Sequence, residues 1–160
     1  MKKVLVLLPR LLLLFTFSLF ITRCSDDDEP QTTADLILGS WVMTGDTYSP
    51  AYDFGAGPVS DAYPLYDACE KDNIFILVAN FVGEFNEGAT KCDPADPQTE
   101  AFAWTLKSNN TILTISQTVA GITIGLDFEI LQLDASTLKL KYTFVESGVT
   151  YTNTTTYARQ

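Results

Sequence analysis

Apolar and polar residues alternate with a period of two over most of the chain after residue 35, which predicts β-strands that each bury one face. In the longest run, residues 122–130, large apolar side chains fall on one face and small, polar or acidic residues on the other. Its phase changes at Ile130-Leu131, which predicts a bulge or bend there. Residues 34–38 suggest a short helix before the first strand. The predicted strands are 38–47, 73–79, 83–87, 102–106, 113–115, 122–130, 138–144 and 149–157.

Short turn sequences separate the later strands, and short connections between sequential strands give an antiparallel up-and-down meander. Eight such strands close most naturally into a barrel, because closure removes both edges of the sheet. The predicted fold class is therefore all-β, an eight-stranded antiparallel up-and-down barrel. A β-sandwich is the alternative. The turn sequences are Ser108-Asn109-Asn110, Ala120-Gly121, Asp134-Ala135-Ser136 and Glu146-Ser147-Gly148.

The connection between the first two predicted strands, residues 48–72, is long. Long irregular loops are usually functional or disordered, and this one is rich in aromatic residues, which need a surface to pack on. We therefore expect an ordered loop with a functional role. Its aromatic residues are Tyr48, Tyr52, Phe54, Tyr63 and Tyr66.

The N-terminus has the layout of a secretory signal: Lys2 and Lys3, then a mostly apolar run to Ile21. Pro9 and Arg10 interrupt this run, and the remaining stretch is too short for a transmembrane helix, which is the alternative. The predicted organisation is a signal peptide over 1–23, a lipidated cysteine and acidic tether over 24–35, and one barrel domain over 36–160.

The sequence Ile21-Thr22-Arg23-Cys24 resembles a lipobox, the motif read by lipoprotein signal peptidase, although Arg23 stands where that motif has a small residue. The resemblance implies a lipid on Cys24 and therefore a membrane partner. A chance cysteine near an ordinary cleavage site is the alternative. The acidic run 25–29 is similar to the signal that sends some lipoproteins to the cell surface. The expected location is the outer membrane, at the cell surface or on the periplasmic face.

Charge narrows the choice of partners. The full chain carries a net charge of −10, and four of its ten basic residues (Lys2, Lys3, Arg10 and Arg23) precede Cys24. The mature chain would keep six basic residues against twenty acidic ones, a net charge of −14. Nucleic-acid binding needs clustered lysine and arginine, so this composition excludes it.

Two cysteines remain once Cys24 is assigned to lipid. In an exported chain a disulfide between Cys69 and Cys92 is the default, and a metal site is the poorer alternative, since the sequence has no histidine. Without histidine or a free thiol, no catalytic set is recognisable. We expect no enzyme activity, no cofactor and no metal site.

The sequence Gly39-Ser40-Trp41 and the arginine Arg159 on the last strand resemble the lipocalins. The resemblance implies that Trp41, with Gly39 and Arg159, plugs the closed end of the barrel. It also implies that residues 48–72 cover the open end. Barrels of this size either fill their interior or hold one small ligand. We expect a small apolar ligand; the alternative is a structural or interaction lipoprotein with a filled barrel and an unidentified protein partner. The expected ligand-lining residues are Tyr48, Tyr52, Tyr63, Tyr66, Phe102, Trp104, Phe128 and Tyr142.

Overall fold

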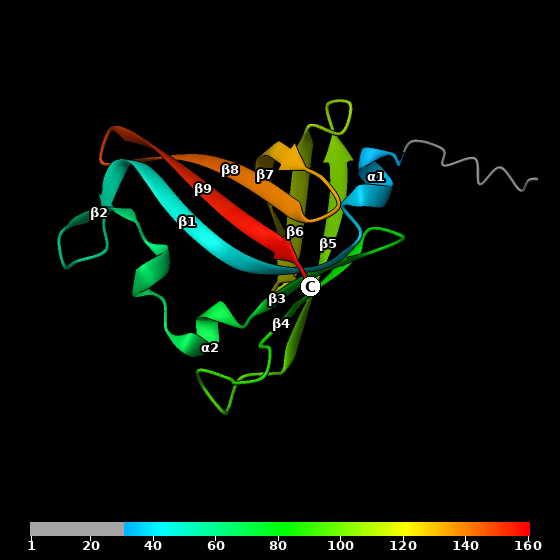
Figure 1. Ribbon diagram of the computed structural model, residues 1–160, viewed down its shortest axis with the longest axis horizontal. Coiled ribbons are helices and arrows are strands. Elements are labelled where there is room, and N and C mark those ends of the chain that lie inside the picture. The colour runs from blue at the N-terminus through cyan, green and yellow to red at the C-terminus, as the bar shows by residue number, and fades with distance from the viewer. Residues whose placement is uncertain (1–30) are drawn as a thin grey trace, which may run out of the picture.

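The computed structural model describes residues 31–160, which form one antiparallel sheet that closes on itself (Figure 1). Eight strands make the barrel, so the predicted fold class is confirmed, and a ninth short strand, β2, pairs along the first strand. No helix within 31–160 is long and apolar enough to cross a membrane. The predicted signal peptide and Cys24 lie outside the described residues. The elements are α1 (Thr33–Leu36), β1 (Gly39–Asp53), β2 (Pro58–Asp61), the 3-10 helix η1 (Tyr63–Leu65), α2 (Ala68–Lys71), β3 (Ile74–Val78), β4 (Val82–Asn86), β5 (Thr99–Lys107), β6 (Ile112–Val119), β7 (Ile122–Leu133), β8 (Thr137–Glu146) and β9 (Val149–Arg159).

Strand β1 closes the barrel because it pairs with two strands at once. Its first residues pair with β3, from Gly39 to Val42, and it pairs with β9 from Trp41 to Ser49. Every other neighbouring pair from β3 to β9 is consecutive in the chain and antiparallel. The register between β7 and β8 shifts between Ile130 and Gln132, which confirms the predicted bulge.

The expectation of a loop over residues 48–72 was wrong in part. Strand β1 continues to Asp53, where it turns back and pairs with β2 through Tyr52↔Val59 and Asp53↔Pro58. The alternation stops at Pro50, which cannot donate a backbone hydrogen bond, but pairing resumes beyond it. The rest of the segment forms η1 and α2. The entry helix α1 starts at Thr33, one residue before the predicted range, and its N-terminus is capped by Thr32 and Asp35.

The half of the barrel at its closed end, which we call the lower half, is filled by a hydrophobic core. The half toward the open end is called the upper half. Figure 1 shows β1, β9 and β8 crossing over β5, β6 and β7, and the core lies between these two layers. Gly83 on β4 leaves room for the Phe102 side chain, because a Cβ at this glycine would overlap the Phe102 ring. The Phe102 ring stacks on Phe75 with centroids 5.2 Å apart. The buried core residues are Ile37, Trp41, Phe75, Leu77, Phe102, Trp104, Leu113, Leu138 and Leu140.

Candidate functional site

The closed end of the barrel brings together Gly39, Trp41 and Arg159. Trp41 is fully buried, its Nε1 donates a hydrogen bond to the Ile37 carbonyl (2.9 Å), and the Arg159 guanidinium carbon lies 4.2 Å from its ring centroid. Arg159 also donates to three carbonyls, those of Leu36, Leu38 and Ala135. Gly39 leaves room for the guanidinium, because a Cβ there would overlap Nη1. This end is sealed and offers no access to a ligand.

The inner face changes from buried to solvent-exposed along β6 and β7. Directly paired residues point to the same face of a sheet. Leu113 is buried in the core and pairs with Phe128, so every second pair from there toward the open end also points into the barrel. The exposed fractions there reach 42% for Leu126, 58% for Ile124, 66% for Ile122 and 63% for Val119. Gln117, paired with Ile124, is the one polar residue of β6 and β7 on this inner face. A mainly apolar inner face that becomes exposed has no side chains from the described part of the chain packed on it.

The upper wall is open between β7 and β8. Their pairing begins only at Glu129↔Lys141, so residues 122–128 of β7 and 142–146 of β8 are not joined. Across this opening, the inner face of β8, β9 and the end of β1 carries aromatic rings in contact. Tyr52 packs edge-on against Phe144 and Tyr151, with centroids 5.6 and 5.1 Å apart. The full series of contacting rings is Phe128, Tyr142, Phe144, Tyr151, Tyr52, Tyr48 and Phe54.

Two mainly apolar cavities lie on the inner side of the upper barrel, and a third, of about 210 Å³, lies under residues 54–70 and is lined by Phe54, Ala62, Leu65, Tyr66 and Glu70. Of the first two, one, of about 150 Å³, lies on the inner face of β6 and β7. The other, of about 200 Å³, which we call the larger cavity, lies between β1, β9, the β3–β4 hairpin and helix α2. Met43, Phe75, Phe85 and Tyr157 supply its apolar wall, and α2 and its flanks supply polar groups. The complete lining of the larger cavity is Met43, Tyr66, Glu70, Asn73, Phe75, Phe85 and Tyr157.

A buried carboxylate ties residues 54–72, which we call the covering segment, to the barrel beside this cavity. Asp46 is 2% exposed and accepts hydrogen bonds from Tyr66 Oη (2.7 Å), Asn153 Nδ2 (2.6 Å) and Thr155 Oγ1 (3.1 Å). Burial, and then the nearby Asp46 charge, raise the pKa of Tyr48 to about 12. Burial and the hydrogen bond to Asp46 likewise raise the pKa of Tyr66. Both phenols therefore stay protonated at neutral pH and can donate to Asp46.

The sequence match agrees with this geometry: residues 37–140 match the family described as lipocalin-like domain. The chain belongs to that family. Lipocalin-like proteins are typically binding proteins without enzyme activity, and within residues 31–160 no three His, Cys, Asp or Glu side chains are placed to hold a metal ion. A search among curated proteins found no match.

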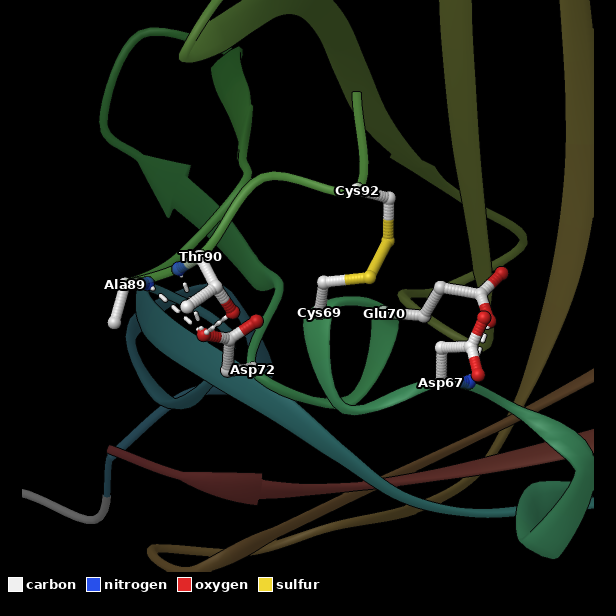
Figure 2. The surroundings of a disulfide bond; sticks show 7 residues. All are labelled: Asp67, Cys69, Glu70, Asp72, Ala89, Thr90 and Cys92. Atoms are coloured by element: carbon white, nitrogen blue, oxygen red, sulfur yellow. Dashed lines mark hydrogen bonds between the residues drawn. A yellow bond between two sulfur atoms is a disulfide. The ribbon is translucent and has the colours of Figure 1, made fainter. Parts of the chain in front are cut away.

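The covering segment of this lipocalin-like barrel is fastened by a disulfide. Cys69 on α2 is bonded to Cys92 in the β4–β5 connection, with Cα atoms 5.3 Å apart (Figure 2). Next to it, Asp72 Oδ2 accepts hydrogen bonds from the backbone N–H groups of Ala89 and Thr90, at 3.1 and 3.0 Å, and from the Thr90 hydroxyl. Two independent links therefore hold α2 against the β4–β5 connection.

Reduction of this disulfide is expected to lower the free energy of unfolding by roughly 3 kcal/mol, because it frees a loop whose ends are 23 residues apart. Urea unfolding followed by circular dichroism, with and without a phosphine reductant, measures the change. The double variant Cys69→Ala/Cys92→Ala serves as the control, since the reductant should have no further effect on it. Equal stability of oxidised and reduced protein would contradict the prediction.

The expected ligand-lining residues lie in different parts of the lipocalin-like barrel: in the core, on the covering segment, in the larger cavity and at the opening. Phe102 and Trp104 lie in the packed core, where Trp104 Nε1 donates to the Val82 carbonyl at 2.8 Å. Tyr63 lies on η1, its ring 5.3 Å from the amine of Lys71, and does not line the larger cavity. Tyr66 does line it. Tyr48, Tyr52, Phe128 and Tyr142 belong to the series of rings at the opening.

Several residues of the larger cavity were not foreseen. Phe85 and Tyr157 could have been found from strand alternation, because each lies on the inner face of a predicted strand. Glu70 and Asn73 carry no such signal. They lie on or beside a four-residue helix whose position depends on the disulfide and on the fold of residues 54–67.

Proposed function

We propose that this protein is a lipid-anchored extracytoplasmic binding protein that holds a small, mainly apolar ligand in the upper half of its barrel. The observation that carries the proposal is the exposed apolar inner face formed by Val119, Ile122, Ile124 and Leu126. Contiguous exposed apolar surface of this kind marks binding sites, and here it faces a row of aromatic rings. Membership of the lipocalin-like family supports the binding role, and the Cys24 sequence supports the anchor.

The size of the cavities supports a small ligand. Pockets for drug-sized molecules usually measure about 300–1,000 Å³, whereas the cavity beside α2 measures about 200 Å³ and the one under residues 54–70 about 210 Å³. The packed core below it leaves no room for a long chain to descend to the closed end. The ligand would therefore lie across the opening, with one end in the cavity beside α2.

A structural or interaction role with a filled barrel is the second candidate. The solid lower half supports it, as do Phe54 and Leu65, which are exposed on the covering segment and could meet another envelope protein. In that case the upper cavities would stay without a specific ligand.

Native mass spectrometry of the protein purified from its own membrane tests both parts of the proposal. We expect a lipid mass on the peptide containing Cys24 and one small molecule retained without a covalent bond. The variant Ile124→Glu, on the inner face, should lose the small molecule. The matched control Val145→Glu should retain it, because Val145 is similarly exposed but lies on the outer face of β8. A wild-type protein without a retained molecule would favour the filled-barrel alternative, and an unmodified Cys24 would overturn the anchor.

A further inference from the structure

We infer that the ligand presents a protonated amine to the cavity beside α2, where the Glu70 carboxylate binds it. This inference rests on the proposed binding function and names the chemical class of the ligand. It follows from three features of the larger cavity: a carboxylate and other acceptors line it, no cation within residues 31–160 forms an ion pair with that carboxylate, and aromatic rings form much of its wall.

The polar lining of the cavity presents several acceptors, beside the N–H donors of the Asn73 amide. Glu70 contributes a carboxylate. The Asn73 side-chain oxygen is buried and receives no hydrogen bond within the described residues, which is a costly state unless a ligand donor meets it. Tyr66 donates its hydroxyl hydrogen to Asp46, so that only the lone pairs of its oxygen remain available. A ligand that brings donors would satisfy all three groups.

Within residues 31–160, no lysine or arginine forms an ion pair with Glu70. The ion pairs there, Lys107–Asp127 and Lys141–Glu129, leave Glu70 out. Lys71 donates to the Pro64 carbonyl and lies over the Tyr63 ring. The remaining basic residues are Lys91, bonded to the carbonyls of Pro94 and Asp96, Lys139, on the outer face between Leu138 and Leu140, and Arg159, at the closed end.

Further carboxylates add to the negative potential at the opening. Asp46 lies behind Tyr66, and Glu100 is paired with the cavity residue Phe85, which places it on the inner face above the cavity. A concave site lined by charge of one sign concentrates ligands of the opposite sign. The same potential disfavours fatty acids and other anions.

The cavity wall suits a cation as well as its apolar body. The rings of Tyr66, Phe75, Phe85 and Tyr157 line it, and aromatic faces attract ammonium groups. Phe75 and Tyr157 lie with centroids 5.8 Å apart. An amine attached to a compact apolar group would place the group among these rings and the nitrogen at Glu70.

Glu70 has a structural task that leaves it free to bind a ligand. Its Oε2 accepts one hydrogen bond, from the Asp67 backbone N–H at 2.7 Å, which caps α2. A carboxylate can accept about four hydrogen bonds, so most of its capacity remains. Figure 2 shows the Glu70 side chain directed away from the disulfide, beside Asp67.

Three probes with the same ring and different head groups test the inference: 2-phenylethylamine, 2-phenylethanol and 3-phenylpropionate. Isothermal titration calorimetry at neutral pH should give the tightest binding for the amine and the weakest for the carboxylate. In Glu70→Gln the affinity for the amine should fall about tenfold, while that for the alcohol changes by less than about threefold. Glutamine also serves in a capping box, so this variant removes the charge and keeps the helix cap.

The matched control is Glu84→Gln, which removes a carboxylate from the outer face of β4, between the inward-facing Gly83 and Phe85. It should leave the affinity for the amine unchanged. Equal affinities for amine and alcohol, or a Glu70→Gln variant that binds the amine as tightly as wild type, would overturn the inference while the apolar binding function stands. The inference also fails if none of the probes binds but a retained molecule is found by mass spectrometry. Loss of both signals would overturn both proposals.

Discussion

Replacing Trp41 with alanine is expected to lower the free energy of unfolding by about 3–5 kcal/mol, the usual range for removing a buried aromatic side chain. Trp41 is fully buried at the closed end and packs under the Arg159 guanidinium, 4.2 Å from its ring centroid. The substitution would leave a cavity, remove the cation–π contact and leave the Ile37 carbonyl without the indole N–H. Urea unfolding monitored by circular dichroism gives the free energy directly.

Two further variants show how much of the loss of stability in Trp41→Ala comes from the indole hydrogen bond and how much from burial of the ring. Trp41→Phe keeps a ring beneath Arg159 and loses the indole hydrogen bond, so its cost should be smaller, about 1–2 kcal/mol. Leu65→Ala removes a large apolar side chain that is 61% exposed on the covering segment, and should change stability by less than about 1 kcal/mol. A wild-type unfolding midpoint in Trp41→Ala would show that this end of the barrel does not depend on the indole.

Strand alternation in the second half of the chain predicted the fold well because those strands are joined by tight turns. From β5 to β9 each hairpin fixes the register of the next pair, so the inward faces follow from the sequence alone. The closed end was predictable for a similar reason, since Gly39, Trp41 and Arg159 lie on the first and last strands, which must meet when the barrel closes.

The sequence could not predict how far each inward side chain lies from the closed end of the barrel, and therefore whether it is buried. Phe102 and Ile124 alternate in the same way, yet the first is buried in the core and the second is exposed at the opening. The difference arises from where pairing stops: β7 separates from β8 above Glu129, and alternation carries no information about that separation.

The inward position of the Asp46 side chain could not be predicted from the sequence either. Strict alternation from Trp41 and Met43 would place Gly45 and Thr47 inside and Asp46 outside. The register between β1 and β9 shifts between Met43 and Gly45, and this bulge turns Asp46 toward the interior. One extra residue thus converts an apparently solvent-facing acid into the centre of a buried network.

Asp46→Ala is accordingly expected to cost at least about 4.5 kcal/mol, because three donors lose their common acceptor and each hydrogen bond to a charged group contributes at least about 1.5 kcal/mol. Two of these donors, Asn153 and Thr155, lie on β9, and the third, Tyr66, lies on the covering segment. Asp46→Asn keeps the volume and one acceptor oxygen, so its cost should be about half as large. Urea unfolding of the variants gives these values.

The contact between Asp46 and Tyr66 predicts a coupling that simple loss of packing would not produce. Tyr66→Phe alone should cost about 1.5 kcal/mol, and in Asp46→Ala it should cost almost nothing, because its acceptor is already gone. Hydrogen exchange should at the same time show faster exchange of the α2 backbone in both single variants, since the link that holds the covering segment to β1 is broken. Additive stabilities in the double variant, with unchanged exchange at α2, would show that Asp46 stabilises the barrel alone and does not position the segment that carries Glu70.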